Sequence, residues 1–224
     1  DNYNYQKGMK EIIQELKNFL KPKDIGTDSD RALLLDFQAT LEIKPEKAIK
    51  LEKDALAQIE NITADNARLV SNLHANLGGL YRMNGHPDLA REHMEKSISL
   101  LDQFNLLHIN DSIPQIANYA MFLTEQQEPE RGISELQKLS GIIKEYHSDD
   151  CLDYAKVQET LGTIYLMTAN LPQAKTHFKR AFKIYEKIWA DEPEMIEAKY
   201  QEIQELYPQI GFCIGKNLSG LLTK

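Results

Sequence analysis

The chain has 224 residues and a formal net charge of −8, with 34 acidic against 26 basic side chains. This balance disfavours direct binding to nucleic acid or to an anionic membrane, because both require a basic surface. Hydrophobic residues make up 42% of the chain, which is enough for a folded core. No run approaches the roughly 18 apolar residues of a membrane span.

The cysteine usage and the start of the chain bear on its compartment. Only Cys151 and Cys213 occur, and no signal peptide opens the sequence, so we expect a reducing, cytoplasmic setting. The chain begins at Asp1 rather than at a methionine, so we expect a fragment or a processed form of a longer protein.

Residues 1–27 predict one amphipathic helix that caps the N-terminal end of the fold. Apolar side chains recur at helical spacing from Tyr5 to Leu20, and Lys21-Pro22 ends the pattern.

From residue 28 to 207 the sequence resembles itself at a constant step of 42 residues. The step carries Leu77-Gly78 onto Tyr119-Ala120 and Leu161-Gly162, and it carries Leu35-Asp36 onto Leu77-Gly78. We expect repeats near 28–65, 66–108, 109–150 and 151–192, a partial repeat at 193–207, and a tail or cap at 208–224. Such a period is the signature of a solenoid whose units stack on their neighbours.

Each repeat predicts two helices. Between Asn66 and Asn84 the apolar residues lie three and four positions apart, as on one face of a helix. Asn84-Gly85 ends that helix, and Pro87 begins the next one, where its missing N–H is tolerated. The fold class is therefore all-α, and we expect small residues such as Gly78 and Gly162 where the two helices cross.

These residues resemble the tetratricopeptide repeat. The best copy is Leu161, Gly162, Tyr165, Ala174, Phe178 and Ala181, whereas the first repeat departs from the pattern with Asp36 and Glu52. The long repeat resembles the variant found in kinesin light chains and in bacterial peptide-sensing regulators. The resemblance implies a right-handed α-α superhelix of four to five helix hairpins whose first helices line a concave groove for a peptide.

The resemblance also implies which residues bind. Asparagines on the first helices of such proteins hydrogen-bond a ligand backbone, and Asn76 and Asn118 occupy the matching positions, with Thr160 in the fourth repeat. A related subgroup captures a terminal carboxylate with a clamp of lysine, asparagine and arginine. Lys156 matches that clamp, but Asn72 and Thr160 replace two of its charged members, which argues against carboxylate capture.

Five further side chains bear on this face. Arg82 and Met83 would flank the asparagines. Met121 and Met167 would lie on the same face as ligand contacts or as core residues, and we favour the core. His74 would line the groove or be solvated, and we favour a solvated histidine.

The sequence contains no catalytic motif, metal-ligand spacing or cofactor motif. We therefore expect a scaffold that binds a protein or peptide and is not an enzyme. The alternatives are the peptide-sensing domain of a larger, possibly transcriptional, regulator and, more remotely, an enzyme subunit. Seven acidic residues between Glu186 and Glu205 indicate a solvated helix face or a contact with a basic partner. Residues Phe212 to Leu222 are a candidate for self-association.

Overall fold

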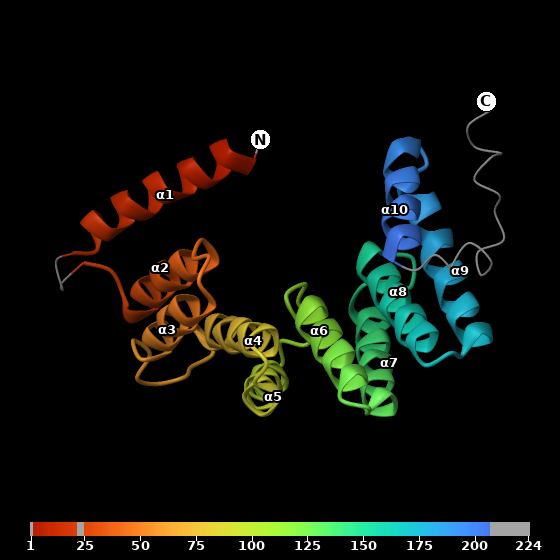
Figure 1. Ribbon diagram of the computed structural model, residues 1–224, viewed down its shortest axis with the longest axis horizontal. Coiled ribbons are helices and arrows are strands. Elements are labelled where there is room, and N and C mark those ends of the chain that lie inside the picture. Colours follow the sequence, from red (N-terminus) through yellow and green to blue (C-terminus); the bar gives the residue numbers. More distant parts are fainter. Residues whose placement is uncertain (1, 22–24, 207–224) are drawn as a thin grey trace. The chain divides into compact units, whose positions relative to one another are not determined.

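The computed structural model describes residues 2–21 and 25–206, and within these ranges the chain forms ten α-helices and no strand (Figure 1). The helices are α1 (Asn2–Phe19), α2 (Asp28–Thr40), α3 (Pro45–Leu56), α4 (Ala67–Met83), α5 (Pro87–Gln103), α6 (Ser112–Glu125), α7 (Pro129–Tyr146), α8 (Leu152–Met167), α9 (Leu171–Ile188) and α10 (Pro193–Leu206). The all-α prediction is confirmed. The tail at 208–224, with Cys213 and the candidate self-association segment, lies outside the described residues.

The chain divides into two compact units, residues 1–107 and residues 108–224. In the first unit α2 pairs with α3 and α4 with α5, and in the second α6 pairs with α7 and α8 with α9. The first helices of successive hairpins also contact each other within each unit, α2 with α4 and α6 with α8. Each unit is thus a stack of two helix hairpins. The first unit also contains α1, and the second unit also contains α10.

The first helices of three repeats end in the same backbone turn. Gly85, Gln127 and Ala169 lie 42 residues apart and have φ angles of 75°, 64° and 58°. In each turn the following N–H returns to a carbonyl in the last turn of the helix, as His86 N does to Tyr81 O at 2.9 Å. Of the three residues, only Gly85 adopts this left-handed conformation without a steric cost, because glycine has no side chain. The helix end predicted at Asn84-Gly85 is confirmed.

Prolines begin the second helices. Pro45, Pro87 and Pro129 are the first residues of α3, α5 and α7. Pro172 is the second residue of α9, because that helix starts at Leu171 behind Asn170, whose side chain accepts a hydrogen bond from Gln173 N at 3.3 Å. The one-residue displacement of Pro172 in the sequence is therefore a change of cap within the first turn.

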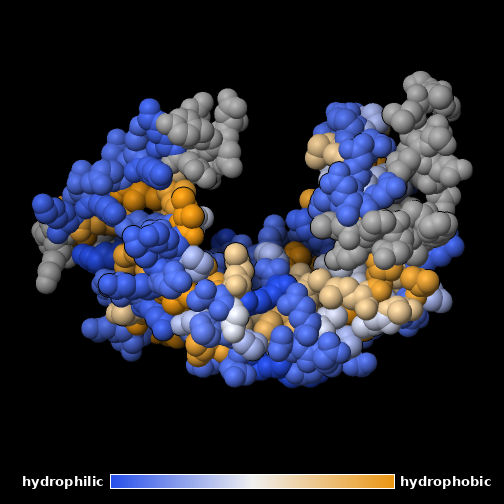
Figure 2. All heavy atoms as spheres, viewed as in Figure 1, coloured by the Kyte–Doolittle hydropathy of each residue, from blue (hydrophilic) through white to orange (hydrophobic). Residues whose placement is uncertain are grey.

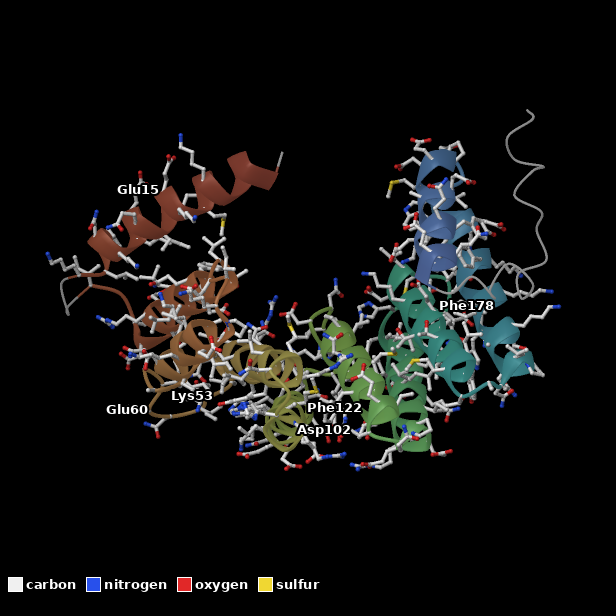
Figure 3. The ribbon with its side chains drawn as sticks, in the orientation of Figure 1. Glu15, Lys53, Glu60, Asp102, Phe122 and Phe178 are labelled. Carbon is white, nitrogen blue, oxygen red and sulfur yellow. The ribbon has the colours of Figure 1, made fainter. Side chains whose placement is uncertain are left out.

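Small residues lie where the helices of a hairpin cross, as predicted. A Cβ at Gly78 would lie 2.6 Å from Met94 Cγ, and one at Gly162 would lie 2.9 Å from Phe178 Cδ2. Figure 3 labels Phe178 beside α8. These approaches are closer than van der Waals contact, so each large side chain fills the space that its glycine leaves.

The helix α1 packs on α2 through part of its apolar face. Ile13 is buried, but Ile12 and Phe19 are 53% and 63% exposed. A cavity of about 220 Å³ lies between the two helices and is lined mainly by leucine and phenylalanine. Apolar atoms are visible in this region in Figure 2. Within the described residues, no helix is long and apolar enough to cross a membrane.

Candidate functional site

The predicted binding residues lie on the first helices of the repeats. In the first unit Asn72, Asn76, Arg82 and Met83 all belong to α4. In the second unit Asn118 belongs to α6, and Lys156 and Thr160 belong to α8. Because α6 and α8 contact each other, these three side chains lie on neighbouring helices.

In the second unit the polar side chains are accessible. Asn118 and Lys156 are exposed, and Lys156 Nζ lies 3.7 Å from Asp153 Oδ1 one turn earlier. Thr160 Oγ1 donates to the carbonyl of Lys156 at 3.0 Å, which leaves its lone pairs to accept a hydrogen bond. Together these residues supply an amide, a cation and a hydroxyl oxygen on two contacting helices.

Two methionines end the first helices in exposed positions. Met83 at the end of α4 is 81% exposed, and Met167 at the end of α8 is 45% exposed. The interpretation of Met167 as a core residue is therefore wrong, because the last turn of α8 turns this position to solvent. Met121 is half-buried on α6.

In the first unit Asn76 contacts two carboxyl groups, which belong to the residues at which the first repeat departs from the repeat pattern. Asn76 Nδ2 donates to Asp36 Oδ1 at 2.8 Å and to Glu52 Oε1 at 3.2 Å. Asp36 lies on α2 and Glu52 on α3, so three helices meet at this point. We refer to Asp36 and Glu52 as the carboxyl pair.

The carboxyl pair holds a proton at neutral pH. Burial, and then the charge of Asp36, raise the pKa of Glu52 to about 9. Burial also raises the pKa of Asp36, although its hydrogen bonds to Glu52 and Asn76 oppose this. Two carboxylates in contact cannot both ionise without strong repulsion, so they share one proton.

Histidines form a second polar contact inside each unit. His74 Nδ1 and His93 Nδ1 lie 2.9 Å apart, and His93 stacks on Tyr81 with ring centroids 5.4 Å apart. Burial lowers the pKa of His74 to about 4 and also lowers the pKa of His93, so both rings are neutral at pH 7. The interpretation of His74 as solvated is wrong, because its ring is half-buried between α4 and α5.

The second unit repeats this arrangement with glutamine in the place of His74. His177 Nδ1 lies 2.9 Å from Gln158 Oε1, and His177 stacks on Tyr165 with centroids 5.3 Å apart. The three residues lie 84 positions after His74, His93 and Tyr81 in the chain. That double step is visible in the sequence and would have identified the contact.

Polar side chains bind the helix α10 to α8 and α9. Lys199 Nζ lies 3.0 Å from Glu159 Oε1, and Tyr185 Oη donates to Glu159 Oε2 at 2.6 Å. Part of the acidic stretch is therefore structural: Glu202 pairs with Lys199 at 3.1 Å, and Glu186 accepts a hydrogen bond from Tyr200. Within the described residues, no group of three or more histidine, cysteine, aspartate or glutamate side chains is arranged to hold a metal ion.

Comparisons with known proteins agree on the fold. The model of the tetratricopeptide repeat family matches residues 112–187. Among solved structures, BtubC (BKLC) from P. vanneervenii is similar with a TM-score of 0.67 and 19% identity, over 81% of this chain and 72% of that one. No curated protein matches the sequence.

Two other structures have the same fold. A putative kinesin light chain from Podosopora anserina with nearly identical repeats has a TM-score of 0.67 and 14% identity, over 84% of this chain and 92% of that one. MamA has a TM-score of 0.56 and 16% identity, over 84% of this chain and 94% of that one. The predicted tetratricopeptide superhelical fold class is confirmed.

Proposed function

We propose that this chain, which carries tetratricopeptide repeats, holds an extended peptide segment of a partner protein along the first helices of its repeats. The tetratricopeptide fold is in general a scaffold for protein interaction. The observation that carries the proposal is that Asn118 is exposed on α6 and Lys156 is exposed on α8, the first helix that contacts α6.

The chemistry of these groups suits a peptide backbone. The amide of Asn118 can donate to a ligand carbonyl and accept from a ligand N–H at the same time. Lys156 adds a positive charge that favours a carbonyl or an acidic side chain, and the thioether of Met167 offers an adaptable apolar contact. No such combination is needed for the packing of α6 and α8, since buried apolar residues supply that.

In the first unit the role of Asn76 is narrower than the resemblance implies. Its Nδ2 group already donates to Asp36 and Glu52, so its carboxamide oxygen is the atom that would accept a ligand N–H. Asn72, Arg82 and Met83 lie on the same helix and complete the proposed contact face of this unit.

We further propose that the protein acts in the cytoplasm by binding rather than by catalysis. The described cysteine, Cys151, is a free thiol, in keeping with a reducing compartment.

The test is capture of partners from the native lysate by the full chain in three forms. These are the wild type, Asn118→Ala, and Gln137→Ala, the last an exposed amide on the second helix α7 that serves as a matched control. We expect a partner that the wild type and Gln137→Ala retain and Asn118→Ala loses. Equal capture by all three forms would move the binding surface away from the first helices.

A further inference from the structure

The carboxyl pair stands where the other repeats place a glycine or alanine and a large apolar side chain. One step of 42 residues carries Asp36 onto Gly78 and Glu52 onto Met94. In the second repeat these two positions make a close apolar contact where α4 and α5 cross. The first repeat has exchanged that contact for two acids, and burying acids destabilises a fold unless they are paired.

The geometry gives Glu52 few hydrogen-bond partners. Glu52 is 2% exposed, and its buried Oε2 atom receives no hydrogen bond from an N–H or hydroxyl group. Its Oε1 atom accepts from Asn76 at 3.2 Å, and its carboxyl group hydrogen-bonds the second acid, Asp36. A buried acid whose partners are one amide and another acid costs free energy, so packing alone does not account for a glutamate here.

The cluster opens to solvent on one side. Asn76 is exposed and Asp36 is half-buried, while Glu52 lies behind them. A ligand group that reaches Asn76 from solvent can therefore contact Asp36 without moving a helix. Both residues lie on first helices, α2 and α4, which contact each other.

The charges around the pair leave a place for a cation. The groups next to Glu52 on α2 and α4 are the other acid of the pair, Asp36, and the neutral amide of Asn76. On α3 the neighbouring Lys53, labelled in Figure 3, has its Nζ 5.6 Å from the centroid of the Tyr81 ring. His74 on α4 and His93 on α5 hydrogen-bond each other. The pair is thus held by an amide and a shared proton.

We propose that Asp36 and Glu52, with Asn76 at the rim, form a subsite for one cationic group of a bound peptide, the guanidinium of arginine or the ammonium of lysine. This inference rests on the proposed peptide-binding function and names the ligand chemistry of its first unit. The cation contacts Asp36, and Asn76 Oδ1 accepts a second hydrogen bond from it. The shared proton leaves to solvent, so the pair passes from one negative charge to two while the ligand brings one positive charge.

The test is a titration of the isotopically labelled full chain, followed by the side-chain amide resonances of Asn76. The probes are acetyl-arginine amide, acetyl-lysine amide and, as a neutral control, acetyl-glutamine amide. We expect a saturable shift with either or both cations and none with the glutamine amide. A preference between the two cations identifies the side chain that the subsite takes.

The pH dependence gives a second readout on the unaltered chain. Because one proton leaves on binding, the affinity for the cation should rise by up to about tenfold per pH unit between pH 6 and 8. The variant Asp36→Asn/Glu52→Gln keeps the shapes and removes both charges, and it should lose the response.

Three results would overturn the inference: no saturable shift, an equal shift with the glutamine amide, or unchanged binding in the neutral variant. The proposed function is judged separately, by the dependence of partner capture on Asn118 in the other unit. Capture that depends on Asn118 with a failed cation titration would remove this subsite and leave the proposed function standing.

Discussion

Replacing Asp36 by glycine and Glu52 by methionine copies the Gly78–Met94 contact of the second repeat into the first, and we expect this exchange to remove a pH dependence of stability. In the wild type the pKa of Glu52 is about 9 when folded, against an ordinary value of 4.5. As the pH rises through this interval, the unfolded chain releases the proton while the folded chain keeps it. The free energy of unfolding therefore falls with rising pH.

The size of the effect follows from one proton. Each pH unit costs about 1.4 kcal/mol per proton retained, so the first unit should lose about 3 kcal/mol of stability between pH 5 and 7 relative to the double variant. The loss is absent below pH 4.5 and complete above about pH 9. The histidines contribute with the opposite sign but are common to both proteins, so they cancel in the difference.

The assay is urea unfolding of both proteins at several pH values, followed by far-ultraviolet circular dichroism. The single tryptophan, Trp189, belongs to the second unit, so its fluorescence serves as an internal control that the exchange should leave unchanged. Parallel loss of stability in the wild type and the double variant over this pH range would refute the shared proton.

Three further results are expected. Gly162→Ala should destabilise the second unit by about 1–3 kcal/mol, because the new methyl group would lie 2.9 Å from Phe178, whereas Gly141→Ala, with nothing within 4 Å, should not; urea unfolding followed by tryptophan fluorescence compares the two. Ala169→Gly should raise the stability of that unit by up to about 1 kcal/mol, because it relieves a φ of 58° at a helix end, and an unchanged or lower unfolding midpoint would contradict this. His74→Gln should flatten the loss of stability that the wild type undergoes as the pH falls from 6.5 to about 4, since the folded His74 resists the proton that the unfolded chain takes up; equal slopes in acid titrations of both proteins would count against it.

The sequence predicted the helices well because the repeat records their packing. The second repeat is the clearest case: a helix end was expected at Asn84-Gly85 and a helix start at Pro87, and α4 ends at Met83 while α5 begins at Pro87. The columns of glycine and large apolar residues that defined the repeat are the crossing points of the hairpins, so periodicity and contact carry the same information.

The polar contacts could not be predicted in the same way. Asn76 lies 40 residues from Asp36 and 24 from Glu52, and only the stacking of three helices brings them together. Asn76 was predicted to bind a ligand from its position in the repeat, and that position gives no information about contacts with Asp36 and Glu52. The exposure of Met167 was missed for a related reason, since periodicity assigns a face but not the place where a helix end leaves its neighbour.

The contact between His74 and His93 was not predicted, although the sequence contains a signal for it. Its copy in the fourth repeat, Gln158 with His177, follows at twice the repeat length. Metal-ligand spacing does not reveal this contact, because the partners belong to different helices and bind each other rather than an ion.

The exchange of an apolar contact for two acids also makes the repeats unequal in how readily they open. In a stack where each unit touches only its neighbours, a weak contact lowers the free energy of local opening there and leaves distant units unchanged. The crossing of α2 and α3 is such a place, and its strength varies with the proton that it holds. The pH, or a cationic ligand that displaces the proton, thus changes the free energy of local opening of the first repeat. The hairpin formed by α8 and α9 is not affected.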